Sequence, residues 1–366
     1  MRTPSEQPRP GGAGAARNAR YARQARLPEW GEQGQARLES AHVVIVGVGG
    51  LGCPAADALA RAGVARITLI DRDLVDETNL HRQVLYTDAD AGEHTPKAVA
   101  AAARLHAVNP GVRALPVIAD VTSANAESLI MGGAFGPPDV LVDGLDGFET
   151  RLLINDVAVK HGVALVYGGA VATRGAHGLL VAPALDGLPR ACLRCVLGDV
   201  PPAGSQPTCD TAGVLGPLVA IVGSQQAAEV LRLLALRRPS RELVSFDLLA
   251  ATRGAVDLAG AHDPACPCCV RRAFRFLDAP PPAASPGLCG REAVQIEAPR
   301  AGEPPDLDAV ARSWAGLGSV RSTPMMARLR LEQSTVLTLF ADGRAIVEGT
   351  TDPAAARALY ARYVGG

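Results

Sequence analysis

The sequence predicts an α/β fold, with a Rossmann-like, doubly wound, mostly parallel sheet and a small C-terminal α+β domain. Three observations predict it. Short apolar runs rich in β-branched residues alternate with helical patterns over the first half of the chain. A glycine-rich turn follows the first of these runs and precedes a helix. A Pro/Ala-rich segment at 279–286 then separates off a shorter tail with its own strand and helix patterns.

The first half of the chain contains four apolar runs that are typical of strands buried on both faces, as in a parallel sheet. These runs lie at 43–46, 67–70, 139–142 and 164–167. Between and after them, helical patterns occupy 54–62, 96–107, 151–161 and 225–236. This alternation indicates βα units stacked into one sheet.

The tail shows shorter runs, and its Asp342-Gly343 pair is typical of a two-residue hairpin turn. We expect strands at 294–296, 329–331, 336–340 and 345–347 and helices at 307–315 and 353–363. The predicted organisation is a disordered tail at 1–20, a main domain at 21–275, a linker at 276–287 and an α+β domain at 288–366.

The composition excludes a disordered chain and gives no sign of a nucleic-acid or membrane partner. Of 366 residues, 48% are hydrophobic, and the formal net charge is −1. The longest uncharged run, Thr211–Ala228, contains glycines, glutamines and a proline, and it is too short for a membrane span. Eight cysteines are too few for a disulfide scaffold. We therefore expect a cytoplasmic protein.

The glycine turn predicts a nucleotide site. Gly47, Gly49 and Gly52 form a G-x-G-x-x-G pattern between a strand and a helix, with Gly50 inside it. Glycines permit a tight turn and close approach of the backbone to phosphate, and the helix N-terminus favours an anion. Asp71 ends the next strand at the spacing of a carboxylate that bonds a ribose hydroxyl.

The residues after Asp71 do not fit a nicotinamide enzyme. Asn79, Arg82 and Lys97 offer donors and cations that a dehydrogenase does not need. Cleavage between the α- and β-phosphates does need them, because charge develops on the departing pyrophosphate. Lys97 is one of only two lysines in the chain. Asp146 lies just beyond a strand's carboxyl end, where a carboxylate can hold Mg²⁺.

Two C-x-x-C pairs predict a metal site. Their local spacing suits tetrahedral Zn²⁺, and a closed four-sulfur site indicates a structural role. Cys268 could replace Cys269 as a ligand, but the C-x-x-C spacing favours Cys269. The predicted ligands are Cys192, Cys195, Cys266 and Cys269.

Taken in order, these motifs resemble the E1-like adenylyltransferases, the ThiF and MoeB proteins of thiamine and molybdopterin biosynthesis. The resemblance runs from about Tyr21 to Cys269. It rests on Arg20-Tyr21-x-Arg23-Gln24, G-x-G-G-L-G at 47–52, Asp71-x-Asp73, Asn79-Leu80-x-Arg82-Gln83 and Lys97. It implies that ATP and Mg²⁺ bind on the sheet. It also implies adenylation of the C-terminal Gly-Gly carboxylate of a ubiquitin-like sulfur carrier protein, for thiamine, molybdopterin or tRNA-thiolation sulfur transfer.

The resemblance also implies roles for single residues. Arg23 would reach the nucleotide of a neighbouring subunit, which implies a homodimer, and a cysteine desulfurase or another sulfur donor becomes a second partner. Cys209 matches a loop cysteine that can link covalently to the carrier. The chain departs from the family at Gly147, where an Asn usually follows the aspartate. The implied catalytic residues are Arg23, Arg82, Lys97, Asp146 and Cys209. The implied nucleotide-binding residues are Gly47, Gly49, Gly50, Gly52, Asp71, Asp73, Thr78, Asn79, Arg82 and Lys97.

Two alternatives stay open on the sequence alone. A nicotinamide or flavin oxidoreductase would account for the glycine turn and Asp71, but it leaves Asn79, Arg82 and Lys97 without a role. A non-catalytic scaffold that binds carrier proteins is favoured only by the missing Asn after Asp146.

Overall fold

The computed structural model describes residues 12–181, 190–198, 209–280, 293–296, 305–331 and 335–365. The chain divides into two compact units between Pro280 and Pro281, inside the segment predicted as a linker. Packing of the first unit continues past the predicted boundary at 275, because the backbone N–H groups of Phe276 and Leu277 donate to the buried Asp156.

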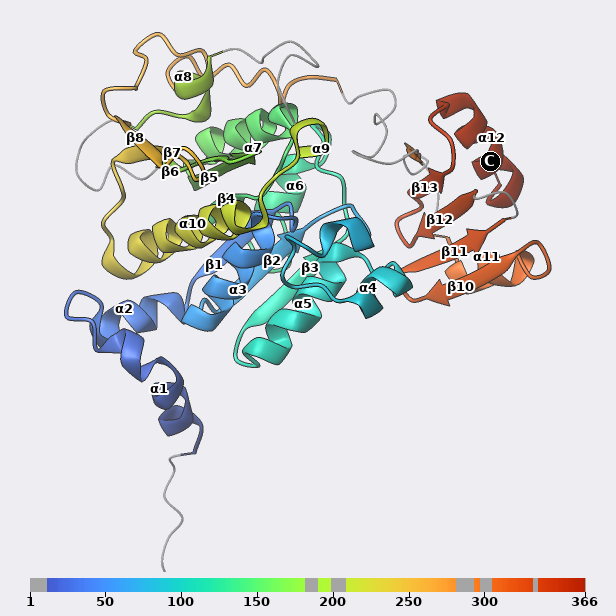
Figure 1. Ribbon diagram of the computed structural model, residues 1–366, viewed down its shortest axis with the longest axis horizontal. Helices are drawn as coiled ribbons and strands as arrows, with labels where there is room; N and C mark the ends of the chain where they lie inside the picture. The colour runs from blue at the N-terminus through green and yellow to red at the C-terminus, as the bar shows by residue number, and fades with distance from the viewer. Residues whose placement is uncertain are drawn as a thin grey trace, which may run out of the picture. The chain divides into compact units, whose positions relative to one another are not determined.

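The first unit is built on one eight-stranded sheet, with the strand order β3-β2-β1-β4-β5-β6-β7-β8 (Figure 1). The first five positions of this order are parallel, and the last three strands join antiparallel. The strands are β1 His42–Val46, β2 Arg66–Ile70, β3 Arg113–Val117, β4 Val140–Asp143, β5 Ala164–Val171, β6 Arg174–Leu180, β7 Glu242–Asp247 and β8 Thr252–Asp257. The predicted doubly wound, mostly parallel sheet is confirmed.

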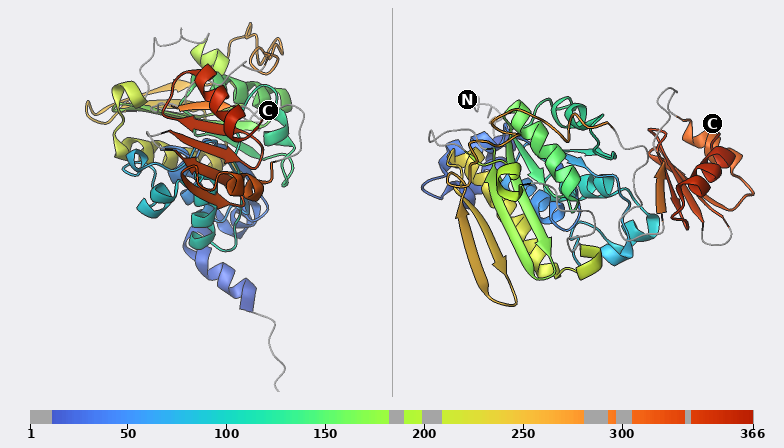
Figure 2. Two further views of the ribbon diagram at one scale, coloured as in Figure 1. Left: turned by 90° about the vertical axis from the view of Figure 1, so that its right-hand side faces the viewer. Right: turned by 90° about the horizontal axis from the view of Figure 1, so that it is seen from above.

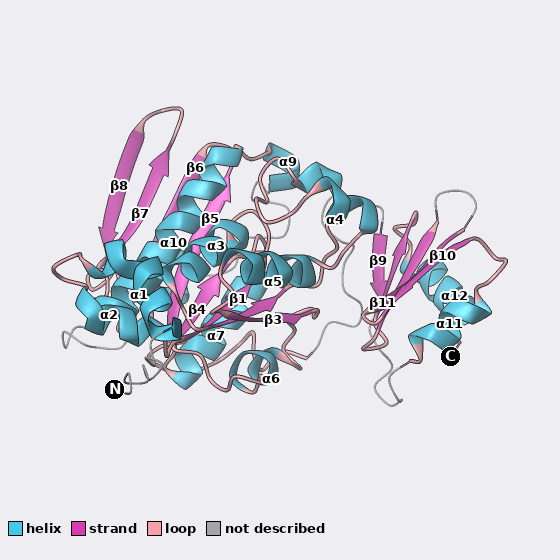
Figure 3. Ribbon diagram, turned by 90° about the horizontal axis from the view of Figure 1, so that it is seen from below, coloured by secondary structure: helices cyan, strands magenta, loops and turns pink. Residues whose placement is uncertain are grey.

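Helices cover both faces of this sheet (Figure 3). Alternate side chains of β1, such as Val43 and Ile45, face a core shared with α3, α5 and α10, whereas Val44 and Val46 face a core shared with α6 and α7. The helices are α1 Gly12–Ala25, α2 Gly31–Leu38, α3 Gly52–Ala62, α4 Asp88–Glu93, α5 Lys97–Val108, α6 Ala126–Met131, α7 Phe148–His161, α8 Leu193–Leu197, α9 Cys209–Ala212 and α10 Gly216–Leu236, with a 3₁₀ turn, η1, at Glu77–Asn79.

Two expectations for this unit need correction. A helix begins at Gly12, so the disordered tail predicted over residues 1–20 is wrong from Gly12 onward, and residues 1–11 lie outside the described residues. The predicted helix at 225–236 is the second part of α10, which begins at Gly216. By length and mean hydropathy alone α10 could cross a membrane. It is a core helix here, because it packs on α2, α3, β5 and β6 and 56% of its most apolar window is buried.

Four strands of this sheet were not predicted: β3, in which Pro116 interrupts the apolar run, and the antiparallel strands β6, β7 and β8. Glycine and polar residues interrupt the sequences of the three antiparallel strands, so neither an apolar run nor a strict alternation marks them. They form because β6 pairs back on β5, and β7 and β8 then extend the sheet. Every residue of β8 is exposed, and the β7–β8 hairpin projects from the sheet as the gold hairpin of Figure 2.

The second unit is a five-stranded antiparallel sheet with the order β10-β11-β12-β13-β9. The two helices in the described part of this unit pack on one face of the sheet, where Trp314 is almost fully buried and donates its indole N–H to the carbonyl of Tyr363 at 2.7 Å. The predicted small α+β domain is confirmed. Its elements are β9 Ala293–Ile296, α11 Leu307–Ser313, β10 Ser319–Thr323, β11 Met326–Arg330, β12 Val336–Phe340, β13 Ala345–Glu348 and α12 Pro353–Tyr363.

Candidate active site and metal centre

The glycine turn follows β1 at the carboxyl edge of the parallel strands. Gly47 has a φ of +86°, and a Cβ there would lie 2.7 Å from the carbonyl oxygen of Gly144, in the loop after β4. Gly52 packs directly on the Gly47 carbonyl. Because β1 is flanked by β2 on one side and β4 on the other, the turn lies at the point where the strand order reverses. This is where open α/β sheets bind ligands.

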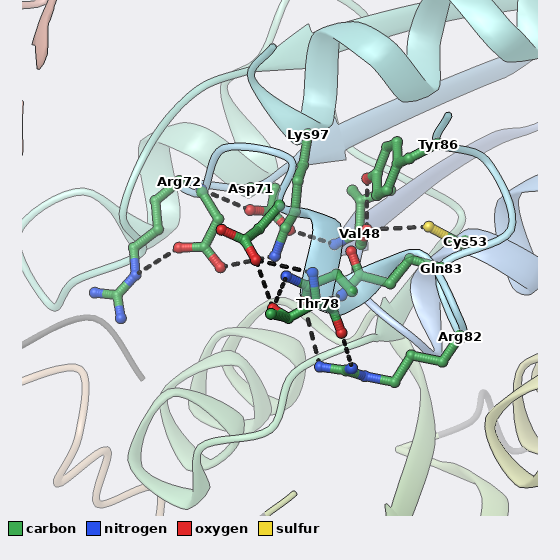
Figure 4. A network of polar contacts seen from close by, with 12 residues as sticks. Val48, Cys53, Asp71, Arg72, Thr78, Arg82, Gln83, Tyr86 and Lys97 are labelled. Carbon is green, nitrogen blue, oxygen red and sulfur yellow. Dashed lines mark hydrogen bonds and ion pairs between the residues drawn. The ribbon is translucent and has the colours of Figure 1, made fainter. Parts of the chain in front are cut away.

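The peptide groups of Val48 hold the turn in place. Its N–H donates to Asp71 Oδ2 at 2.7 Å, and its carbonyl accepts the Tyr86 hydroxyl at 2.6 Å and the Cys53 thiol at 3.2 Å (Figure 4). Burial raises the pKa of the Cys53 thiol to about 12, so Cys53 is an inert buried group.

Asp71 lies against the glycine turn, as its spacing predicts. Its second oxygen accepts the N–H of Asp73 at 2.8 Å. Burial raises the pKa of the Asp71 carboxyl, and the charge of Lys97 opposes that shift. A carboxylate can accept more than the two hydrogen bonds that Asp71 receives from the N–H groups of Val48 and Asp73. Asp71 can therefore also accept a hydrogen bond from a ribose hydroxyl.

Lys97 is brought to the same place by the start of α5. Its Nζ lies 2.9 Å from Asp73 Oδ2, and its backbone N–H donates to the Asp73 carbonyl at 2.9 Å. The Lys97 side chain is 7% exposed, whereas that of Asp73 is 40% exposed. A buried cation with a half-exposed counter-ion can be presented to an anionic ligand while its charge stays compensated in the ligand-free protein.

The segment around η1 gathers the predicted Thr78, Asn79 and Arg82. The Arg82 guanidinium donates to the Thr78 carbonyl and to Asn79 Oδ1, both at 3.1 Å (Figure 4). Gln83 also donates to Asn79 Oδ1, at 2.9 Å, and its amide nitrogen faces Gly49. Gln83 is buried, and its Oε1 has no hydrogen-bond partner among the described residues. In the sequence, Gln83 is part of the motif Asn79-Leu80-x-Arg82-Gln83, but it was not predicted to belong to the site.

The loop between β4 and α7 carries Asp146, which is exposed. The peptide groups of Leu145, immediately before it, are held from both sides. Asp143 Oδ1 accepts the Leu145 N–H at 3.0 Å, and Arg151 donates to the Leu145 carbonyl. Arg151 Nε also lies 3.5 Å from Asp143 Oδ2, and its guanidinium stacks over the Tyr167 ring. Sequence reasoning missed Asp143 and Arg151, although both are buried charges beside the predicted Asp146.

Two predicted residues stand apart from this set. Arg23 is exposed on α1, and its neighbour Gln24 bonds the Ala62 carbonyl at the far end of α3. Eleven residues of α3 span roughly 16 Å between that end and the glycine turn. Cys209 begins α9, but its side chain lies outside the described residues. The next helix, α10, lies against the glycine turn, where its Val219 packs on Gly50.

The four predicted metal ligands converge on the opposite side of the sheet from α10. The Sγ atoms of Cys192, Cys195, Cys266 and Cys269 all lie within 4.8 Å of one another. Neighbouring Sγ pairs are 3.9, 3.7 and 3.5 Å apart. Four thiolates bound tetrahedrally to Zn²⁺ at about 2.3 Å would lie roughly 3.8 Å apart, so the cluster fits zinc as its ligand set predicts.

Comparison with known proteins gives consistent matches. The ThiF family model matches residues 21–268. The sulfur carrier protein ThiS adenylyltransferase of Bacillus subtilis is 38% identical over 347 residues, covering 94% of this chain and 99% of that protein. The sulfur carrier protein adenylyltransferase of Thermus thermophilus is 43% identical over 252 residues, which cover 68% of this chain and 90% of that protein. A crystal structure of Escherichia coli MccB shares the fold, with a TM-score of 0.59 at 20% identity over 69% of this chain and 74% of that chain.

Proposed function

The chain belongs to the ThiF family, and from this premise we propose that it adenylates the C-terminal Gly-Gly carboxylate of a ubiquitin-like sulfur carrier protein with ATP. One observation carries the proposal. At the reversal point of the sheet, Lys97 is linked to the glycine turn through Asp73 and Asp71, Arg82 is linked to it through Asn79 and Gln83, and the loop that carries Asp146 packs on Gly47. That arrangement suits a triphosphate better than a dinucleotide.

The reaction is a displacement at phosphorus. A carboxylate oxygen of the carrier attacks the α-phosphorus, and the bond to the oxygen bridging the α- and β-phosphates breaks. The products are an acyl-adenylate and pyrophosphate. Negative charge grows on the leaving pyrophosphate, and fixed cations lower the barrier by stabilising it. Lys97 and Arg82 supply the positive charge that stabilises the leaving pyrophosphate. The N–H groups of the turn bind phosphate oxygens, and Asp71 accepts a hydrogen bond from a ribose hydroxyl.

Asp146 is the proposed Mg²⁺ ligand. It is the exposed carboxylate of the β4–α7 loop, whereas Asp143 behind it already accepts the Leu145 N–H and faces Arg151. Bound Mg²⁺ would neutralise phosphate charge and act as a Lewis acid. Asp143 accepts the N–H of Leu145 and Arg151 donates to its carbonyl, and these contacts position the loop. They hold the backbone beside Asp146 in place, although the following residue is Gly147 rather than Asn.

The tetracysteine cluster is proposed to hold a structural Zn²⁺. Its four ligands complete the coordination, so no position remains for substrate. A site of this kind contributes on the order of 10 kcal/mol to local folding at neutral pH.

The remaining partners are proposed from Arg23 and Cys209, two residues that match the ThiF pattern in the sequence. Arg23 lies at the far end of α3 from its own glycine turn, which favours a homodimer in which it serves the neighbouring subunit. The Cys209 thiolate is proposed to attack the carbonyl carbon of the acyl-adenylate, so that a thioester with the carrier forms as the bond to AMP breaks and AMP leaves. A cysteine desulfurase or another sulfur donor is the proposed source of the sulfur. We expect these reactions in the cytoplasm.

The test is exchange of labelled pyrophosphate into ATP by the purified chain. Exchange is expected only with both Mg²⁺ and a carrier that ends in Gly-Gly, and a carrier lacking the last glycine is the matched control. Carrier binding without exchange would instead establish a scaffold. Carrier-independent oxidation of NADH would establish the oxidoreductase, and either result would overturn the proposal.

A further inference from the structure

The helix α7 places two adjacent polar side chains in the interior beside the cysteine cluster. Asn155 is 0% exposed and Asp156 is 1% exposed. Burial of an amide and a carboxylate is costly unless both are hydrogen-bonded. Their hydrogen-bond partners therefore indicate what these residues do.

Asn155 bridges the two cysteine segments, which are far apart in the sequence. Its Oδ1 accepts the N–H of Leu193, which lies between Cys192 and Cys195, at 2.8 Å. Its Nδ2 donates to Cys268 Sγ, in the second segment, at 3.4 Å. A single amide thus holds the backbone of one segment and a side chain of the other.

Asp156 holds the second segment and the chain that follows it. Its Oδ1 accepts the Cys268 thiol at 3.2 Å. Its Oδ2 accepts the N–H groups of Phe276 and Leu277 at 2.9 and 3.3 Å. Both carboxylate oxygens of Asp156 therefore accept hydrogen bonds. Through them α7 holds the second cysteine segment at Cys268 and the chain that follows it at Phe276 and Leu277.

Cys268 is a competing ligand that the sequence places between Cys266 and Cys269. It is 1% exposed, yet it is not one of the four cysteines whose Sγ atoms gather within 4.8 Å. Asn155 and Asp156 both bind its sulfur. We infer that these two residues select the metal's ligand set: they hold Cys268 outside the coordination sphere and fix both segments in position.

This inference rests on the proposed zinc site and is independent of adenylation. Four thiolates and Zn²⁺ already carry a net charge of about −2, and a fifth buried thiolate would add charge without a counter-ion. Groups that orient metal ligands from outside typically account for 10–100-fold in metal affinity. We therefore expect zinc affinity to fall by about 10–100-fold when Asn155 or Asp156 is changed.

The experiment measures transfer of zinc from the purified full chain to a chelating dye. Asn155→Ala and Asp156→Asn are expected to release zinc about 10–100-fold faster than the unmodified chain. Lys160→Met, on the exposed end of the same helix, is the matched control and is expected to release zinc at the unmodified rate. Cys268→Ala should keep one zinc per chain, and Cys269→Ala should not.

Two results would overturn the inference. One is zinc release at the unmodified rate from whichever of Asn155→Ala and Asp156→Asn is soluble, and Asp156→Asn keeps the side-chain volume. The other is loss of the tetrahedral four-thiolate absorption of bound Co²⁺ in Cys268→Ala, which would make Cys268 a ligand. Neither readout depends on adenylation, so failure here leaves the proposed function standing.

Discussion

Asp143→Asn removes a carboxylate that the fold buries at the end of β4. Asp143 is 1% exposed, and burial raises its pKa from 3.8 to about 6, although Arg151 and the Leu145 N–H act in the opposite direction. The Asn oxygen can still accept the Leu145 N–H. The substitution therefore tests the cost of the buried charge while it keeps the loop's hydrogen bond.

The magnitude follows from the two pKa values. Between pH 3.8 and about 6 the folded chain binds more protons at Asp143 than the unfolded chain, so this carboxyl makes the protein less stable as the pH rises. A shift of this size is worth on the order of 3 kcal/mol, of which about 2 kcal/mol falls between roughly pH 4.5 and 7.5. Asn does not titrate, so the variant should gain about 2 kcal/mol on the unmodified chain over that range. The attraction of Arg151 for the ionised carboxylate lowers this pKa, so it is already contained in the value of about 6 and needs no separate correction.

Urea denaturation across this pH range measures the difference. The chain has two tryptophans, Trp30 in the first unit and Trp314 in the second. In a Trp314→Phe background, fluorescence of Trp30 reports unfolding of the first unit alone. A difference in the free energy of unfolding that stays the same at every pH would refute the reasoning, because it would mean that burial does not raise this pKa.

Three further predictions concern the reaction. Lys97→Met should reduce pyrophosphate exchange by about 10²–10³-fold, because a cation that stabilises the leaving pyrophosphate is lost; Lys160→Met is the control, and retained exchange would remove Lys97 from the site. Arg151→Lys should raise the Mg²⁺ concentration for half-maximal exchange by about 10-fold, since a charged hydrogen bond to Leu145 is weakened; an unchanged requirement would show that Arg151 does not position the loop. Mixing inactive Arg23→Ala and Lys97→Met chains should restore about a quarter of the exchange by random pairing of subunits, and no recovery would contradict a role for Arg23 across the dimer.

Four of the five parallel strands and the glycine turn could be predicted because their signals are local, whereas β3 was missed because Arg113 and Pro116 interrupt its apolar run. Val43 to Val46 are apolar on both faces, and the strand is buried on both faces. Gly47 and Gly52 stand where backbone meets backbone, which only glycine allows. The two C-x-x-C pairs likewise marked the four cysteines that converge.

The antiparallel part of the large sheet could not be predicted in this way. β6 contains Gly175 and Gly178, and β8 is exposed throughout, so neither carries an apolar pattern. Their pairing depends on a neighbouring strand distant in sequence. The start of α10 at Gly216 was missed for a similar reason: its glycines, such as Gly223, allow close packing on α3, which the sequence does not reveal.

By itself, then, the sequence determined which residues have the chemistry: the glycine turn, the cations after it and the four ligand cysteines. Only the tertiary structure decided which residues support them. Arg151, Asn155 and Asp156 lie on α7, a helix buried nearly all the way round, and they have no apolar periodicity to place them. In the sequence, these three residues cannot be distinguished from ordinary polar residues. Their roles arise because the fold brings the Leu145 carbonyl and the Cys268 thiol to the same helix.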